Sequence, residues 1–154
     1  MSQKKPKLGQ NFLTSPGARQ HIVEALGDIS AATVLEIGPG RGALTDLLAT
    51  RARRLIAVEL DRALAPRLAA TWAHAKHIRV IQADILDLDL TTVLENPGEK
   101  LIVVGNLPYY ITSDILLHLF SQAASIARAV VMVQDEVADR LAAHEMPPKQ
   151  MPQP

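Results

Sequence analysis

The chain has 154 residues, enough for one domain with a substantial hydrophobic core, and 48% of the residues are hydrophobic. Sixteen basic and sixteen acidic residues give a formal net charge of zero, so the composition lacks the basic excess typical of nucleic-acid-binding proteins. The absence of cysteine excludes disulfides and thiolate metal sites, and no apolar run approaches the length of a membrane span. Because the basic N-terminus also lacks the apolar segment of a signal peptide, we expect a cytoplasmic protein.

Apolar, strand-like runs alternate with helical patterns along the chain. In chain order the sequence predicts a helix over 16–26, a strand over 33–37, a helix over 43–50, a strand over 55–58, a helix over 63–72, strands over 78–81 and 101–104, a helix over 113–121, a strand over 129–133 and a helix over 137–143. We expect the first of these helices to cover the functional site.

Some side chains outside the motifs also have predicted places. Thr112 or Ser113 is the expected N-cap of its helix, whose apolar side should consist of Ile115, Leu116, Leu119 and Phe120. Trp72 and Phe120 are expected to pack in the interior, and His74 and His77 to lie on the surface without a metal. A cluster of three basic residues is expected to be solvated surface: Arg51, Arg53 and Arg54.

The order of the elements predicts an α/β fold. Strands that alternate with helices imply a parallel sheet with right-handed crossovers. The strands are continuously apolar, which is typical of a sheet covered on both faces. We therefore expect one domain over residues 1–143, with the segment 1–15 included, and a disordered, proline-rich tail over 144–154.

Three acids and a glycine-rich loop lie at the ends of the first three predicted strands. The first strand runs into Glu36-Ile37-Gly38-Pro39-Gly40-Arg41-Gly42, whose glycines let the backbone approach a ligand closely. Glu59 ends the second strand, where an acid binds ribose hydroxyls in doubly wound folds, and Asp84 ends the third. The G-x-G-x-G spacing argues against a dinucleotide oxidoreductase, which uses G-x-G-x-x-G. Asp87 and Asp89 are expected to be surface or capping residues, and Glu36 to position the glycine loop.

The fourth strand ends in Asn106-Leu107-Pro108-Tyr109. The asparagine amide can both accept and donate hydrogen bonds, and the proline stiffens the turn. The tyrosine ring offers a flat face for stacking. The segment therefore suits a planar base that carries an exocyclic amine.

These motifs together resemble the ribosomal RNA adenine N6-dimethyltransferases, and most closely those that act on the small subunit. The resemblance covers roughly residues 7 to 143 and includes Gly9-Gln10-Asn11-Phe12-Leu13, the segments named above, and Val133-Gln134-Asp135-Glu136-Val137-Ala138. It implies a Rossmann-like methyltransferase core with strand order 3-2-1-4-5 and S-adenosylmethionine as the cofactor. The implied substrate is a pair of adjacent adenosines near the 3′ end of small-subunit rRNA, in an immature 30S-type subunit.

The resemblance also implies a role for each site residue. Asn11 and Leu13 would lie at the methionine end of the cofactor, and Gly38 would line it. Glu59 would hold the ribose hydroxyls and Asp84 the adenine amine. Asn106 would sit between cofactor and target base, where its oxygen and the Pro108 carbonyl would accept the amine N–H groups. Tyr109 would stack on the extruded base, and Phe12 and Tyr110 are either further stacking residues or core.

Two departures from the family pattern leave alternatives open. The family usually has a lysine where this chain has Asp135, and it continues with a final strand pair and a small helical domain that have no counterpart here. We therefore expect an exposed edge on the fifth strand, through which self-association is expected. The alternatives are a methyltransferase for adenine in DNA or large-subunit rRNA, a non-catalytic RNA-binding or assembly protein, and an inactive fragment that retains cofactor binding.

Overall fold

The computed structural model describes residues 16–108, 110–133 and 135–143. Its elements are α1 (Pro16–Leu26), β1 (Thr33–Ile37), α2 (Ala43–Ala49), β2 (Arg54–Glu59), α3 (Leu64–Thr71), β3 (Ile78–Gln82), η2 (Ile85–Asp87), η3 (Leu90–Val93), β4 (Leu101–Asn106), α4 (Thr112–Ser121), η4 (Ala123–Ser125), β5 (Ile126–Met132) and α5 (Asp135–Ala143). All ten predicted elements are present, with ends that shift by a few residues. The 3₁₀ helices of the described residues, η2, η3 and η4, were not predicted.

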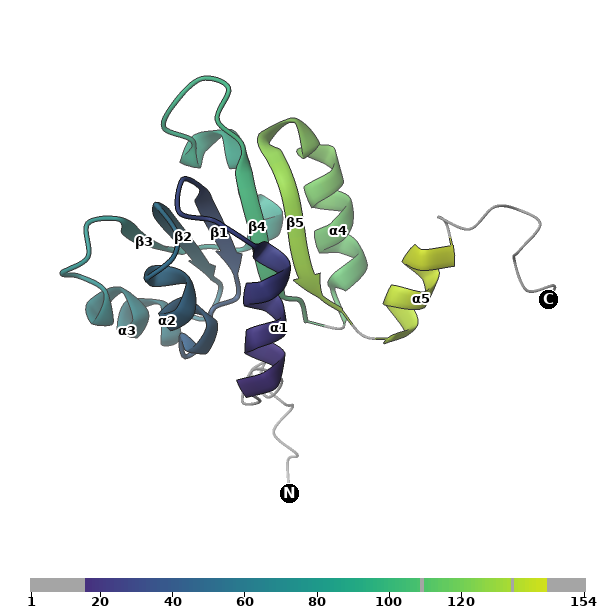
Figure 1. Cartoon of the computed structure of the whole chain (residues 1–154), viewed down its shortest axis with the longest axis horizontal. Coiled ribbons are helices and arrows are strands. Elements are labelled where there is room, and N and C mark those ends of the chain that lie inside the picture. Colours follow the sequence, from purple (N-terminus) through teal and green to yellow (C-terminus); the bar gives the residue numbers. More distant parts are fainter. Residues whose placement is uncertain (1–15, 109, 134, 144–154) are drawn as a thin grey trace.

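The five strands form one parallel sheet in the order β3-β2-β1-β4-β5. Figure 1 shows the strands side by side with helices on both faces. The predicted α/β class, strand direction and strand order are therefore confirmed. Strands β1 and β4, which lie in the interior of the sheet, are buried along their whole length, as their continuous apolar sequences indicate. Among the described residues β5 pairs only with β4, so its other edge carries no strand.

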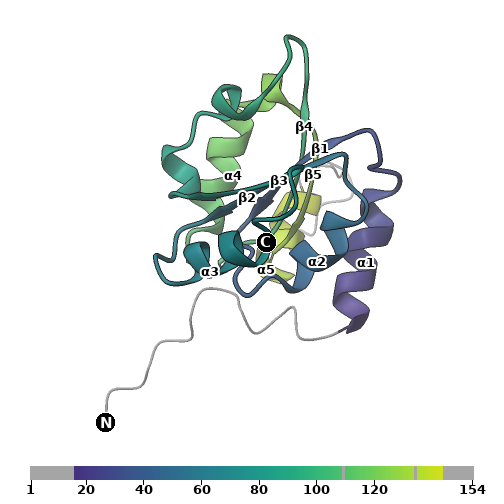
Figure 2. The same cartoon turned by 90° about the vertical axis from the view of Figure 1, so that its left-hand side faces the viewer.

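Each face of the sheet has its own hydrophobic core. Strand side chains on one face, such as Val34 and Val104, pack against residues of α1 and α2 that include Leu26 and Leu44. Strand side chains on the opposite face, such as Leu35, pack against α4, η2 and η3. In Figure 2 the two groups of helices lie on opposite sides of the strands. This alternation decides the face toward which each residue at a strand end points.

Helix α1 does not cover the pocket described below, contrary to the prediction. Its buried side chains are Ile22, Val23 and Leu26, of which Ile22 and Leu26 pack in the core on the α2 side of the sheet. The Arg128 guanidinium of β5 donates a hydrogen bond to the Leu26 carbonyl at the end of α1. The described part of the helix is therefore fixed against β5, and none of its residues lines the pocket.

Three smaller predictions about side chains were wrong. The N-cap of α4 is Ile111, because Thr112 already belongs to the helix and its hydroxyl donates to the Pro108 carbonyl. Phe120 is 64% exposed instead of packed. Arg54 is partly buried, since it donates to the Val93 carbonyl and pairs with Glu95, which ties β2 to the loop before β4. None of the described helices is both long and apolar enough to cross a membrane.

Candidate functional site

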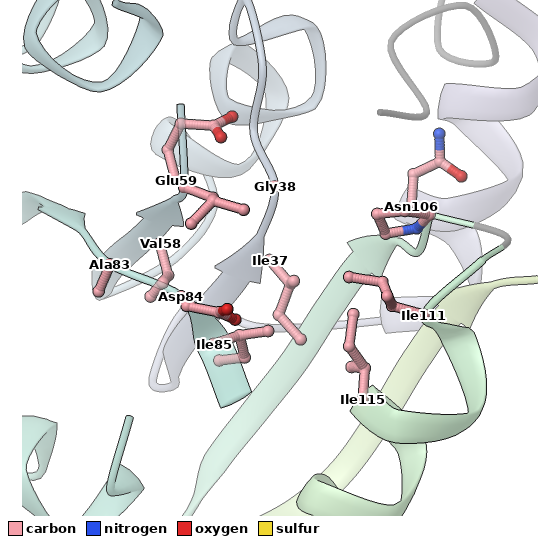
Figure 3. Close-up of a pocket in the computed structure, with 12 residues that line it drawn as sticks. Ile37, Gly38, Val58, Glu59, Ala83, Asp84, Ile85, Asn106, Ile111 and Ile115 are labelled. Carbon is pink, nitrogen blue, oxygen red and sulfur yellow. The ribbon is translucent and has the colours of Figure 1, made fainter. Parts of the chain in front are cut away.

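A pocket lies at the carboxyl ends of four strands, and Figure 3 shows the residues that line it. Its empty volume, counted with its open mouth, is about 530 Å³. The lining residues are Ile37, Gly38, Val58, Glu59, Leu60, Ala83, Asp84, Ile85, Asn106, Pro108, Ile111 and Ile115. The described residues Gly38, Glu59, Asp84, Asn106 and Pro108, which the sequence singled out from separate segments, thus meet in one pocket.

The strand order explains why these residues meet. Parallel strands have their carboxyl ends at the same edge of the sheet, and ligands of such sheets bind there. Asp84 follows β3, Glu59 ends β2, Gly38 follows β1 and Asn106 ends β4, so the strand order sets them in a row. In Figure 3 the two carboxylates lie on one side of Gly38 and Asn106 lies on the other.

The glycine loop has a backbone that residues with side chains rarely adopt. Gly38, Gly40 and Gly42 have φ angles of 66°, 58° and 91°, in the left-handed region. A Cβ atom at Gly42 would also lie 2.9 Å from Leu68 Cδ1 of α3. The left-handed backbone conformation favours glycine at position 42, whereas the Leu68 methyl group, at the end of a flexible side chain, could shift to admit a Cβ atom.

The Glu59 carboxylate is bonded to the backbone of two loops, those that follow β1 and β2. Its Oε1 accepts from the Gly40 N–H at 2.8 Å, and its Oε2 accepts from the Asp61 N–H at 2.9 Å. The residue is 5% exposed. Glu59 therefore reaches from β2 to the middle of the glycine loop, a contact that the sequence did not reveal.

Asp84 lines the pocket and also caps η2. Its Oδ1 accepts from the Leu86 N–H at 3.0 Å. Asp89 makes the same cap at η3, where its Oδ1 accepts from the Thr91 N–H at 2.9 Å, but it does not line the pocket. The expected capping role is confirmed for Asp89, while Asp84 combines a cap with a place in the pocket.

At the opposite wall, β4 approaches β1 closely just before Asn106. A Cβ atom at Gly105 would lie 2.8 Å from the Ile37 carbonyl oxygen, so no side chain fits there. Asn106 is 9% exposed. Its backbone carbonyl oxygen lies 4.0 Å from the place that a Cβ atom would occupy if Gly38 had one. The close approach therefore places Asn106 beside the first glycine of the loop.

The Pro108 carbonyl is already an acceptor within the protein. The Thr112 hydroxyl donates to it at 2.8 Å, and the Ile111 N–H donates to it at 3.2 Å. A carbonyl oxygen has two lone pairs. The Pro108 oxygen can accept a bond from a substrate amine only if one of these two bonds is exchanged.

Glu36 does not line the pocket and does not bond to the glycine loop in the way expected of it. It is fully buried, and the Thr45 hydroxyl of α2 donates to its Oε2 at 2.6 Å. Burial, with smaller contributions from the Glu59 and Asp46 charges, raises the pKa of Glu36 to about 8, although the Thr45 bond lowers it. The residue therefore joins β1 to α2 as a largely protonated acid at neutral pH, and Glu59 holds the loop instead.

The apolar walls of the pocket were missed by sequence reasoning. Leu60 and Ile85 each follow directly after a site acid, and Ile111 and Ile115 come from the start of α4. The first two could have been found by reading the residue after each acid. The second two depend on how α4 packs against the sheet, which no local pattern reveals.

The remaining predicted residues fall into two groups. Asn11, Leu13 and Tyr109, together with Phe12, lie outside the described residues, so their predicted roles stay predictions. His74 stacks on Trp72, which itself packs against the core as predicted, and His77 Nε2 lies 2.8 Å from the Ala49 carbonyl oxygen. These contacts give the two histidines structural roles.

Residues 1–148 match the family model described as "Ribosomal RNA adenine dimethylase". Two similar proteins are both called "Ribosomal RNA small subunit methyltransferase A". The protein from Acidobacterium capsulatum is 65% identical over 90% of this chain and 49% of its own length, and the protein from Koribacter versatilis is 56% identical over 91% and 53%. The chain thus spans about half the length of the curated relatives it matches.

Solved structures with the same fold include two adenine or rRNA methyltransferases. The 23S rRNA methyltransferase ErmE has a TM-score of 0.72 and 35% identity, over 88% of this chain and 52% of the other. A dimethyladenosine transferase from Plasmodium falciparum has a TM-score of 0.70 and 27% identity, over 84% and 45%. The fold is therefore the Rossmann-like fold of these methyltransferases.

Proposed function

Because the family model matches nearly the whole sequence, the chain belongs to the ribosomal RNA adenine dimethylase family, and we propose that it is an S-adenosylmethionine-dependent methyltransferase core that dimethylates N6 of adenosines in small-subunit rRNA. The observation that carries this proposal is the single pocket in which Glu59 and Asp84 face Asn106 across Gly38. Since the chain spans about half of its relatives, the activity, the substrate and the partners all belong to the proposal.

The pocket has the chemistry that an adenosyl group needs. Two carboxylates can accept hydrogen bonds from ribose hydroxyls and from an adenine amine, which are the roles proposed for Glu59 and Asp84. Leu60 and Ile85 beside them supply apolar surface for the purine faces. Gly38 lets the backbone approach the ligand, and Asn11 and Leu13 are proposed for the methionine end. When bound, S-adenosylmethionine supplies a methyl group on a sulfonium, which is already a good leaving group.

The proposed work of the protein is to orient the acceptor amine. The N6 lone pair of adenine is delocalised into the ring, so the amine is a poor nucleophile. If the Asn106 amide oxygen accepts one N–H, the nitrogen can pyramidalise and direct its lone pair at the methyl group. Pro108 adds a second acceptor if its carbonyl exchanges the Thr112 bond, and Tyr109 is proposed to stack on the base. Orientation of this kind can supply roughly 7–11 kcal/mol of the barrier.

The small subunit is the proposed substrate because of the names of the similar sequences. The two relatives at 65% and 56% identity are named for the small subunit, whereas the 23S enzyme is 35% identical. We place the reaction on two adjacent adenosines of an immature small subunit, in the cytoplasm. Self-association through the β5 edge is a separate part of the proposal, and it rests on the absence of a described strand beyond β5.

Methyl transfer from labelled S-adenosylmethionine to immature small ribosomal subunits tests the proposed reaction. The RNA is digested to nucleosides, and large subunits serve as a parallel substrate. We expect the label in N6,N6-dimethyladenosine from the small subunit. Label in the RNA of the large subunit alone would contradict the proposal that the small subunit is the substrate. Cofactor binding without any transfer would favour an RNA-binding or assembly protein over an enzyme.

The Asp84→Asn variant should weaken the affinity for S-adenosylmethionine by about 10- to 100-fold, as measured by calorimetric titration. The asparagine oxygen can still cap η2, but its NH₂ group replaces the carboxylate oxygen that would face the adenine amine. Asp89→Asn is the matched control, since it changes the same kind of cap outside the pocket. Equal affinities of Asp84→Asn and wild type would remove Asp84 from the proposed site.

A further inference from the structure

The N–H group in the middle of the glycine loop is bonded to a side chain. Two described backbone bonds support the loop: the Gly38 N–H donates to the Val58 carbonyl at 2.9 Å, and the Gly42 N–H donates to the Pro39 carbonyl at 2.9 Å, which closes a turn around Gly40 and Arg41. The buried Gly40 N–H between them donates to Glu59 Oε1 at 2.8 Å. Since a buried N–H without a partner is costly, the loop conformation is tied to this carboxylate.

We infer that Glu59 positions the glycine loop before any ligand binds, in addition to the contact with ribose hydroxyls that the proposed function gives it. Its two oxygens accept from Gly40 and Asp61, which lie in the loops that follow β1 and β2. A carboxylate has about four acceptor sites, so two remain for a diol. The inference rests on the proposed function only for the identity of the ligand, because the two backbone bonds are present without it.

This double role has a consequence for binding. Part of the contribution of Glu59 to cofactor affinity must come from its bond to the Gly40 N–H, which keeps the loop in place. That part does not depend on the ribose hydroxyls of the ligand. A glutamine at position 59 has one oxygen, so it can accept from only one of the two N–H groups, and its NH₂ group would face the other. Glu59→Gln should therefore release either the Gly40 or the Asp61 amide even in the absence of ligand.

Amide hydrogen exchange of the ligand-free protein tests the positioning role directly. We expect the Gly40 or the Asp61 amide to exchange about tenfold faster in Glu59→Gln than in wild type, and both to do so in Glu59→Ala. The Gly38 amide, which bonds to the Val58 carbonyl, is the internal control and should keep its rate. Wild-type rates at both amides in Glu59→Ala would overturn the inference, and if that variant does not fold, wild-type rates at both in Glu59→Gln would do so.

A binding comparison separates the positioning role from the diol contact. S-adenosylhomocysteine and its 2′,3′-dideoxy analogue are titrated into wild type, Glu59→Gln and the Asp89→Asn control. We expect Glu59→Gln to bind the dideoxy analogue about tenfold more weakly than wild type does, and the control to match wild type. Equal binding of the analogue by wild type and Glu59→Gln would reduce Glu59 to a diol contact and overturn the inference. If wild type binds neither ligand, the proposed cofactor fails, while the exchange rates still decide the positioning role.

Discussion

Replacing Asn106 by alanine should lower the rate of methyl transfer by about 100-fold or more, with a far smaller change in the affinity for S-adenosylmethionine. The variant loses the amide that is proposed to accept an N–H of the target adenine, so the lone pair of the amine is no longer directed at the methyl group. The donor keeps Glu59, Asp84 and the apolar walls on the other side of the pocket. Initial rates with labelled donor and immature small subunits measure the effect, together with a calorimetric titration of the donor.

Asn96→Ala is the matched control for this experiment. Asn96 is exposed in the loop before β4, and it does not line the pocket. The control should transfer methyl groups at the wild-type rate. Equal incorporation by wild type and Asn106→Ala would show that Asn106 does not orient the amine, and it would leave the proposed mechanism without its central residue.

The Glu36→Gln variant should be more stable than wild type at alkaline pH by roughly 3–5 kcal/mol and about equally stable at pH 5. Burial raises the pKa of Glu36 from 4.5 to about 8 in the folded protein. The folded state therefore favours the protonated acid, and this contribution to stability is complete below the unfolded pKa. It is lost as the pH rises from 4.5 through about 8. In this range the unfolded chain ionises Glu36 readily, whereas the folded protein must keep the buried group protonated or bury its charge.

Denaturant unfolding at several pH values measures this difference. Glutamine is neutral at every pH and can still accept from the Thr45 hydroxyl, so the pH dependence between 4.5 and 8 should largely disappear in the variant. Glu24→Gln, on the exposed side of α1, is the control and should follow wild type. A pH dependence that is the same in Glu36→Gln and wild type would contradict a raised pKa at this position.

The strands and their order were predictable because the signals are local or topological. Continuous apolar runs mark buried strands, and alternation with helices fixes a parallel sheet. Once the sheet is parallel, Glu59, Asp84 and Asn106 must share an edge, since each stands at the carboxyl end of a strand. Their positions in the sequence are therefore enough to predict that they lie together.

That Glu59, and not Glu36, bonds to the glycine loop was not predictable from the motif alone. Glu36 lies two residues after Val34, whose side chain packs on the α2 side, so it points toward Thr45 and away from the pocket. Which side of the sheet carries α2 depends on the whole fold. The short helices η2 and η3 were missed for a similar reason, because single aspartate caps and tertiary contacts define them and no periodic pattern does.

The prediction that Phe120 packs in the interior was wrong because it relied on the apolar type of the residue and not on its position around the helix. Successive residues of an α-helix are about 100° apart, so Ile115 and Leu119 lie on nearly the same side, and Phe120 lies well around from them. The structure accordingly buries Ile115 and Leu119 and leaves Phe120 and Leu117 exposed. Apolar type alone therefore did not decide which residues of α4 meet the sheet.

A crystal structure of this chain with S-adenosylhomocysteine tests most directly whether one pocket presents a methyl donor to Asn106. We expect the ribose hydroxyls to bond to Glu59, the adenine amine to bond to Asp84, and the sulfur to lie on the Asn106 side of Gly38. The adenine should lie between Leu60 and Ile85, and the Gly40 N–H should keep its bond to Glu59. A ligand bound elsewhere, or one whose sulfur points away from Asn106, would contradict the assignment of this pocket to methyl transfer.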